Sequence, residues 1–288
     1  MTAWLRLLRP KQWVKNGALF LPLFFAGRAD EVELLIDVSR AFAAFSLVAS
    51  SLYVVNDYLD RHRDALHPKK RRRPFASGAV PPQAVWILVP LLWAMAALVG
   101  WGLPVAFWGI TAAYWVMNLF YSVRLKHVPV LDVSLIAVGF VLRLFAGGVT
   151  ADVPLSPWIV VMIFLISVFM ALGKRMEDVR IFEASGEVMR PVVHGYNLSV
   201  LRHAMSMMGA VVIVAYVLYT LDAQVVARIG NPHFYLTSFF VVLGVLRYLV
   251  LVLVDERGGS PTEVLWTDRF LHVVIAGWAL AVAWFLYF

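Results

Sequence analysis

The sequence predicts an all-α polytopic membrane protein, a bundle of nine transmembrane helices with the N-terminus in the cytoplasm and the C-terminus outside. Of its 288 residues, 61% are hydrophobic and only 15% are charged. A soluble domain is nearer half apolar, with about 25% charged residues. Apolar runs of membrane-spanning length recur along the chain, and the basic residues collect in alternate connections between them.

A transmembrane helix needs about 20 mostly apolar residues. Nine segments fit this requirement, although the first is short and contains Pro22. Their ranges are 13–28, 36–58, 82–101, 104–123, 129–149, 156–173, 203–221, 233–254 and 269–288. Proline and glycine turns mark several of the breaks between them. No shift in composition divides the chain, so we expect one integral-membrane domain over residues 1–288.

The distribution of charge sets the orientation of these spans. With the N-terminus inside, twenty of the 25 Lys and Arg residues lie in cytoplasmic segments and two lie in external ones. Cytoplasmic loops of membrane proteins carry such an excess. The same rule accounts for the net charge of +7, so we expect no nucleic-acid partner. We expect a multi-pass protein of the cell (inner) membrane, with its active site on the cytoplasmic side.

The most informative segment is residues 56–64, at the end of a long apolar stretch. Asp57, Asp60 and Asp64 follow at i, i+3 and i+7, so on one helix their carboxylates share a face. Aligned acids at the end of a membrane helix are costly unless a positive group lies between them. Magnesium is usually held by a few carboxylates and by substrate phosphates. We therefore predict these three acids to be catalytic and to bind metal, with Asn56 as a fourth ligand.

Basic residues surround this segment and are candidates for binding phosphate. The run from Lys69 to Arg73 is typical of a cytoplasmic loop that faces anionic lipids, but its guanidinium groups also match phosphate oxygens. Both interpretations stay open. Arg143 lies in mid-span, where a cation needs a partner or a polar cavity, and we expect it to face such a cavity. Asp132 is about three helical turns away and is not an obvious direct partner.

Two later segments could complete the site. Residues 121–126 end one predicted span, and a predicted long cytoplasmic loop over residues 174–202 mixes charges of both signs. Each segment is also explained by interface anchoring or solvation. The seven histidines show no metal-ligand spacing, and the sequence has no cysteine. The candidate substrate-binding residues are Lys15, Asn56, Lys70, Arg73, Tyr121, Lys126, Arg143, Lys174, Arg175 and Tyr196.

With these residues in hand, the chain resembles the UbiA superfamily of intramembrane prenyltransferases. The motif Asn-Asp-x-x-Asp-x-x-x-Asp is complete at residues 56–64. In that superfamily it binds Mg²⁺-diphosphate within a nine-helix bundle. The similarity is greatest to the decaprenyl-phosphate phosphoribosyltransferase branch, on segments 8–16, 67–74, 121–126, 172–175 and 259–263. A second Asp-x-x-x-Asp motif, usual in aromatic-acceptor members, is replaced here by Lys174-Arg175 followed by Glu177, Asp178, Glu183 and Glu187.

The resemblance implies a Mg²⁺-dependent membrane glycosyltransferase. Its donor would be 5-phosphoribosyl diphosphate and its acceptor a decaprenyl-like polyprenyl phosphate, in cell-envelope biosynthesis. One alternative is a prenyltransferase of the same superfamily that uses a prenyl diphosphate and an aromatic or other acceptor. Another is a lipid-binding or transport protein, although no matched pair of broken helices supports a transporter. Whether the protein forms a homo-oligomer is left open.

Overall fold

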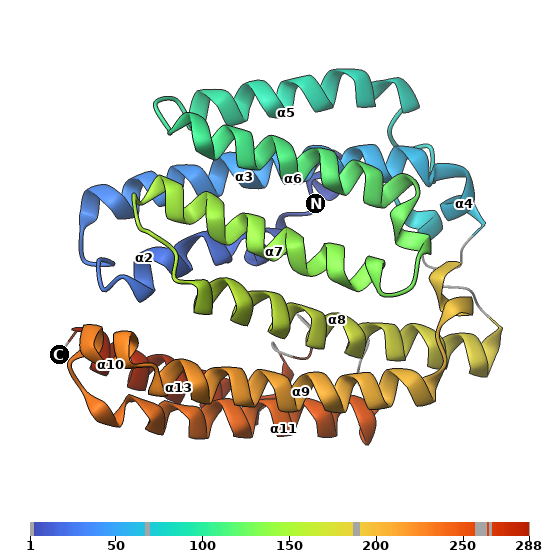
Figure 1. Ribbon diagram of the computed structural model, residues 1–288. Helices are drawn as coiled ribbons and strands as arrows, with labels where there is room; N and C mark the ends of the chain where they lie inside the picture. The colour runs from blue at the N-terminus through green and yellow to red at the C-terminus, as the bar shows by residue number, and fades with distance from the viewer. Residues whose placement is uncertain (1–2, 67–69, 187–190, 257–263, 265–266, 288) are drawn as a thin grey trace. The chain divides into compact units, whose positions relative to one another are not determined.

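The structure is a computed structural model that describes residues 3–66, 70–186, 191–256, 264 and 267–287 (Figure 1). Every regular element in these residues is a helix, and none of them forms a strand. The chain divides into two compact units. The first comprises Met1–Val123 and Gly139–Leu155, and the second Arg124–Val138 and Ser156–Phe288. Helix α7 (Leu131–Thr150) contributes residues to both units.

Six helical stretches in the described residues are long and apolar enough to cross a membrane. They are Pro82–Val99, Leu131–Thr150, Pro157–Ala184, Leu198–Leu221, Pro232–Leu253 and Arg269–Tyr287. They coincide with six of the nine predicted spans, which confirms a helical, multi-pass chain. The predicted spans 13–28, 36–58 and 104–123 are not among them. Polar side chains interrupt the apolar runs of the last two, among them Ser50 and Asp57 in one and Asn118 in the other.

The first predicted span is broken in the structure. Helix α1 (Ala3–Leu8) is followed by the 3₁₀ helix η1 (Pro10–Phe20) and the short helix α2 (Leu21–Phe25). Runs of 3₁₀ helix longer than a few residues are uncommon. This segment is therefore held by its surroundings rather than by its own hydrogen bonds alone.

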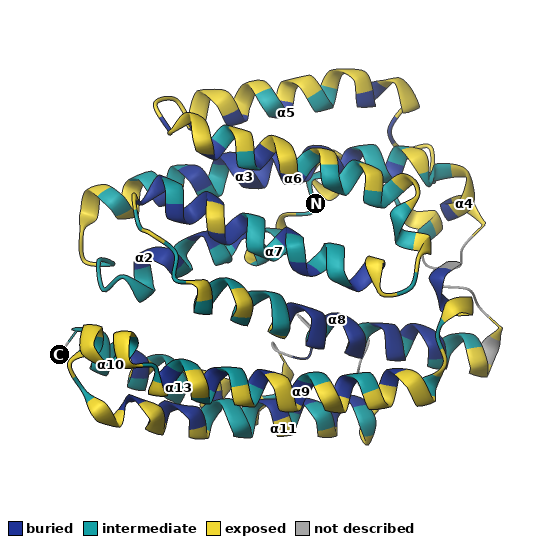
Figure 2. Cartoon of the chain, viewed as in Figure 1, coloured by how far each residue is buried: buried dark blue, intermediate teal, exposed yellow. Residues whose placement is uncertain are grey.

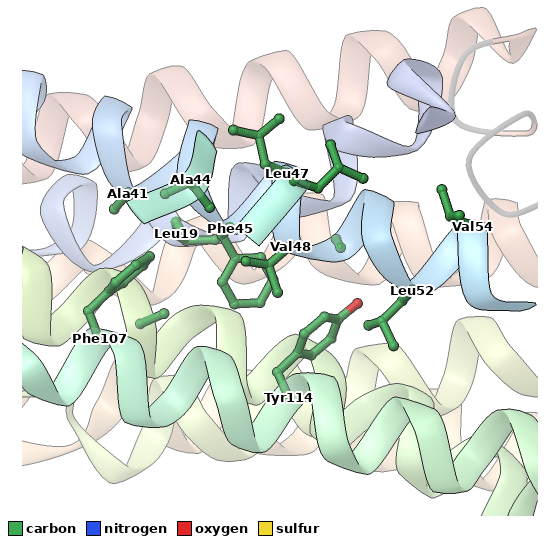
Figure 3. Close-up of a cluster of buried hydrophobic side chains, with 14 of the residues drawn as sticks. Leu19, Ala41, Ala44, Phe45, Leu47, Val48, Leu52, Val54, Phe107 and Tyr114 are labelled. Atoms are coloured by element: carbon green, nitrogen blue, oxygen red, sulfur yellow. The ribbon is translucent and has the colours of Figure 1, made fainter. Parts of the chain in front are cut away.

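Helix α3 (Val32–Leu59) is the centre of the first unit. Helices α5 (Val85–Val99) and α6 (Val105–Val123) pack beside it, together with η1. Small side chains such as Ala41 and Ala44 let the neighbouring backbones approach α3. Phe45 of α3 packs against Tyr114 of α6 (Figure 3). The first unit also contains the short helices α4 (Arg61–Ala65), η2 (Lys70–Arg72) and η3 (Pro82–Ala84).

The second unit is built on α8 (Pro157–Ser185), α9 (Leu198–Leu221), α11 (Ser238–Leu253) and α13 (Arg269–Tyr287), and adjacent pairs of these helices pack together. Shorter elements are η4 (Leu125–His127), η5 (Pro191–Gly195), α10 (Ala223–Ile229) and η6 (Pro232–Thr237). Asn197 begins α9 by accepting a hydrogen bond of 2.8 Å from the Val200 amide. Such caps satisfy amides that have no partner within the helix.

The predicted loop over residues 174–202 is partly wrong. Helix α8 continues to Ser185, so Lys174, Arg175 and Asp178 lie on a helix rather than in a loop. With 29 residues, α8 is about 44 Å long, which exceeds the thickness of the bilayer core. The extra turns therefore carry polar residues beyond the apolar part of the helix. Glu187 and Arg190, which belong to this predicted loop, lie outside the described residues.

Large apolar side chains cover the outer faces of several helices. On α5, Trp86 and Leu98 are 73% and 75% exposed, and the helix is exposed along much of its length (Figure 2). On α13, Leu280 and Trp284 are likewise exposed. Large apolar side chains exposed on several helices fit contact with lipid.

Candidate active site

The predicted acidic segment crosses a break between two helices. Helix α3 ends at Leu59, Asp60 follows, and α4 begins at Arg61. The Asp60 amide donates to the Asn56 carbonyl at 3.0 Å, and the Asp64 amide donates to the Asp60 carbonyl at 2.8 Å. The chain therefore keeps turning in the right-handed sense across the break. Asp57 and Asp64 are buried at 2% and 4% exposure, whereas Asp60 is half-buried.

One guanidinium group joins the two buried acids. Arg73 Nη1 lies 3.1 Å from Asp57 Oδ1 and 2.7 Å from Asp64 Oδ2. Arg73 comes directly after η2 and is followed by Pro74, which restricts its backbone to extended conformations. The positive group that the acids require is thus supplied, in this structure, by a residue that the sequence had suggested as a phosphate ligand.

Arg9 is a second cation at the same place, and sequence reasoning missed it. Its Nη2 donates to Asp57 Oδ1, the oxygen that Arg73 also contacts. The Arg9 guanidinium lies 5.2 Å from the centroid of the Tyr53 ring, one turn before Asp57 on α3. Its backbone is left-handed, with φ 49° and ψ 57°, a conformation that costs energy for a residue other than glycine. The only signal in the sequence was one basic residue among several near the N-terminus.

These contacts change the predicted metal site. Among the described residues, no three His, Asp or Glu side chains are grouped so that they could hold a metal ion. The single helix expected over Asp57, Asp60 and Asp64 is interrupted, because α3 ends at Leu59 and α4 begins at Arg61. Asp57 and Asp64 do converge, since both reach the same nitrogen of Arg73.

Two carboxylates still fit magnesium. This ion is commonly bound by one or two carboxylates together with substrate phosphates, rather than by a complete protein cage. The donor set of Asp57 and Asp64 has that chemistry, and both side chains are shielded from solvent. The roles of Asn56 and Asp60 as further ligands stay predictions.

A row of polar side chains on α3 binds the N-terminal segment. Trp13 Nε1 donates to Ser50 Oγ at 3.0 Å, and Asn16 Nδ2 donates to Ser46 Oγ at 2.8 Å. Ser50 Oγ in turn donates to the Leu8 carbonyl at 2.8 Å. Because residues spaced by three or four share a helix face, this row continues to Tyr53 and Asp57. The α3 helix thus fixes α1 and η1, and with them Arg9.

Arg143 on α7 is buried at 5% exposure and lies within this first unit. Its Nε donates to Asn16 Oδ1, its Nη1 to the Gly139 carbonyl and its Nη2 to the Tyr114 hydroxyl, each at 2.7 Å. Its guanidinium lies 4.5 Å from the Tyr114 ring centroid. Arg143 therefore links η1, α6 and α7 through neutral acceptors, as expected if it has no direct pair with Asp132. Its contact with substrate stays a prediction.

The second unit contains a separate buried cluster. Arg175 on α8 is 1% exposed and donates through Nε to Asp132 Oδ2 and through Nη1 to Asp178 Oδ2, the latter at 2.6 Å. The Tyr196 hydroxyl donates to Asp132 Oδ1 at 2.8 Å. It also accepts a hydrogen bond of 2.6 Å from the Val130 amide. Val130 is left-handed at φ 69°, which is strained for a β-branched residue.

Burial raises the pKa of the Tyr196 hydroxyl to about 12, and its hydrogen bond to Asp132 acts in the same direction. Tyr196 therefore stays protonated at neutral pH and remains a donor to Asp132. The sequence had suggested Arg175 and Tyr196 as substrate ligands. In the structure they hold α8 and the start of α7 to the segment before α9.

The other predicted ligands are distributed over both units. Lys15 lies on η1, Lys70 on η2 and Tyr121 near the end of α6, all in the first unit. Lys126 lies on η4 and Lys174 on α8, in the second unit. All five side chains are half-buried. Their contacts with phosphate stay predictions.

Comparison with known proteins places the chain in a family. Residues 18–274 match the model of the UbiA prenyltransferase family. The chain is 33% identical to the decaprenyl-phosphate phosphoribosyltransferase of Mycolicibacterium smegmatis, over 99% of this chain and 92% of that protein. It is also 33% identical to the Corynebacterium glutamicum protein of the same name, over 98% of this chain and 86% of that protein.

Solved structures agree on the fold. A UbiA homolog from Archaeoglobus fulgidus, bound to DMAPP and Mg²⁺, superposes with a TM-score of 0.71. The match covers 99% of each chain, at 18% sequence identity. The family predicted from the motif at residues 56–64 is confirmed: the chain belongs to the UbiA prenyltransferase family.

Proposed function

We propose that this protein transfers a 5-phosphoribosyl group from 5-phosphoribosyl diphosphate to decaprenyl phosphate or a similar polyprenyl phosphate. The observation that carries the proposal is the similarity to two decaprenyl-phosphate phosphoribosyltransferases along almost the whole chain. The surplus of cations around the acids fits this activity, because both substrates carry phosphate.

The reaction exchanges one bond at the ribose. A phosphate oxygen of the acceptor forms a bond to C1 of the ribose, and the bond from C1 to the diphosphate oxygen breaks. Diphosphate leaves, and the product is polyprenyl-phosphoryl phosphoribose. The acceptor phosphate is already ionised at neutral pH, so the step needs no strong general base.

Asp57 and Asp64 are the residues proposed to hold Mg²⁺, with Asn56 and Asp60 as further candidates. When bound, the ion supplies positive charge that stabilises the leaving diphosphate. Lys15, Lys70, Lys126 and Lys174 are proposed to bind phosphate groups of donor or acceptor. Holding the two substrates in reach of one another supplies much of the rate.

Arg143 and Arg175 have different proposed roles. Each is almost fully buried and engaged with protein acceptors in its own unit. Beside the predicted contact of each with substrate, we propose a positioning role: Arg143 fixes the N-terminal segment that carries Arg9, and Arg175 fixes the helix that carries Lys174.

The membrane arrangement is part of the proposal. The chain would form a single domain over residues 1–288 with nine spans, the N-terminus in the cytoplasm and the C-terminus outside. The supporting observation is the charge asymmetry of twenty cytoplasmic to two external basic residues. The acidic segment would then open to the cytoplasmic side of the cell membrane, and the polyprenyl tail would lie along apolar helix surfaces.

The test is an assay with purified protein in detergent or lipid nanodiscs. Radiolabelled 5-phosphoribosyl diphosphate, Mg²⁺ and decaprenyl phosphate are incubated with it, and the lipid fraction is separated and identified by mass spectrometry. Labelled polyprenyl-phosphoryl phosphoribose, absent when EDTA replaces Mg²⁺, is expected. A parallel reaction contains a prenyl diphosphate and an aromatic acceptor. Product only in that second reaction would show a prenyltransferase, and ligand binding without product in either would point to a lipid-binding or transport protein.

A further inference from the structure

The acids that are proposed to bind magnesium already carry two cations of the protein itself. Arg9 and Arg73 both contact Oδ1 of Asp57, and Arg73 also contacts Oδ2 of Asp64. Two arginines and two aspartates give the cluster a formal charge of zero. The carboxylate oxygens that a metal ion needs are therefore the same oxygens that hold the guanidinium groups.

We propose that Arg9 is a donor-binding residue that works by exchange: it neutralises Asp57 before the substrates bind, and it moves to the diphosphate of the donor when a divalent cation takes its place. This inference rests on the proposed function, because it deepens the binding of that donor. It requires no covalent step. Contacts between arginine and carboxylate are simply replaced by contacts between arginine and phosphate and between metal and carboxylate.

Three features suit Arg9 to this exchange. Its side chain is about one quarter exposed (26%), whereas that of Asp57 is buried (2%), so Arg9 is the partner that an incoming substrate can reach. Its backbone is left-handed, so the bound position is held by contacts and not by local preference. Its guanidinium also lies over the Tyr53 ring, which gives the planar group a face to stay on while its hydrogen bonds change.

The exchange predicts that removing Arg9 has opposite effects on metal binding and on donor binding. Removing Arg9 should tighten metal binding in the absence of donor, because a competing cation is gone. It should also weaken donor binding at saturating metal, because a phosphate ligand is gone. A residue with only a structural role would weaken both when it is removed.

The experiment compares Arg9→Gln with Lys11→Gln in the full-length protein. Both changes remove one positive charge from the same segment, but Lys11 is exposed and forms no ion pair among the described contacts. Binding of Mn²⁺, used as the probe metal, is measured by electron paramagnetic resonance without donor. Because Mn²⁺ no longer has to displace a partly exposed ion pair, Arg9→Gln should bind Mn²⁺ about two- to fivefold more tightly than Lys11→Gln. The KM for 5-phosphoribosyl diphosphate at saturating Mg²⁺ should rise in Arg9→Gln, and Arg9→Lys should restore part of it.

Two further measurements keep the result decisive. Arg73→Gln, which leaves Arg9 in place, should also tighten Mn²⁺ binding, and thermal unfolding of each variant shows whether it has folded. Equal or weaker Mn²⁺ binding in folded Arg9→Gln, or no Mn²⁺ binding by any form, would overturn the exchange. Failure of the proposed function is distinguishable, since it appears as absence of phosphoribosyl lipid from wild-type protein, whereas the Mn²⁺ comparison needs no turnover.

Discussion

Replacing Arg175 by methionine should destabilise the second unit severely. Asp132 is fully buried and Asp178 nearly so, and Arg175 contacts both. Breaking a buried ion pair by removal of one partner costs about 3–5 kcal/mol, because the other charge stays buried without compensation. Methionine fills a similar volume, so the loss arises mainly from charge and hydrogen bonds rather than from a cavity.

The assay is thermal unfolding of the protein in detergent, followed by intrinsic tryptophan fluorescence. A loss of this size should lower the midpoint by roughly 10 °C. The matched control is Arg202→Met on α9, whose side chain is exposed. Away from specific contacts, a surface change should alter stability by no more than about 0.5 kcal/mol.

A second variant tests the reason for the loss. If uncompensated acids cause it, Asp178→Asn added to Arg175→Met should recover part of the stability, with a coupling of about 1–3 kcal/mol. A role for Arg175 in compensating the buried acids is refuted if Arg175→Met melts within about 2 °C of the Arg202→Met control, a shift well below that expected for such a loss. It is also refuted if the double variant recovers nothing.

Three further predictions follow from local geometry. Gly147→Ala should cost about 1–3 kcal/mol in unfolding experiments, because an added Cβ would collide with the Leu19 backbone, and unchanged stability would contradict the packing of α7 on η1. Val130→Asn should raise stability by about 1 kcal/mol, since asparagine tolerates the left-handed backbone and the Val130 side chain is exposed; a loss would count against that conformation. Tyr196→Phe should cost about 1–3 kcal/mol at pH 7, because buried Asp132 loses a donor. Because the pKa of Tyr196 is about 12 when folded and about 10 when unfolded, its contribution should be constant below pH 10 and fall between pH 10 and 12. A wild-type minus Tyr196→Phe difference that already varies between pH 7 and 9 would refute this assignment.

The sequence predicted the parts of the fold that depend on long apolar runs and on residue spacing. Long apolar runs identify six spans directly, and the motif at residues 56–64 identifies the family. Prediction was weaker where one helix carries both an apolar run and polar turns. Helix α8 extends to Ser185 because its polar turns remain helical after the apolar run ends, and hydropathy alone marks only that end. The 3₁₀ segment of η1 could not be predicted, because tertiary hydrogen bonds such as Asn16 to Ser46 support it.

The candidate site was predicted by residue type but not by partner. Asp57, Asp64 and Arg73 were identified, and the structure joins them. Arg9 was missed because its partner lies 48 residues later in the chain, and one sequence carries no information on such a contact. Arg175 was predicted as a phosphate ligand from its charge, and its ion pair with Asp132, 43 residues earlier, was not predicted. In both cases the ion-pair partner of the arginine is distant in the sequence and is identified only by the structure.

The most direct test of the account is the turnover of Asp57→Asn in phosphoribosyl transfer to decaprenyl phosphate. Asp30→Asn, an exposed acid with no ion pair among the described contacts, is the matched control. Losing a metal-binding carboxylate removes several kcal/mol of transition-state stabilisation, so turnover should fall by at least about a hundredfold. The control should remain at the wild-type rate. Near wild-type turnover in Asp57→Asn, with an unchanged requirement for Mg²⁺, would contradict the central claim that this buried acid holds the metal ion that stabilises the departing diphosphate.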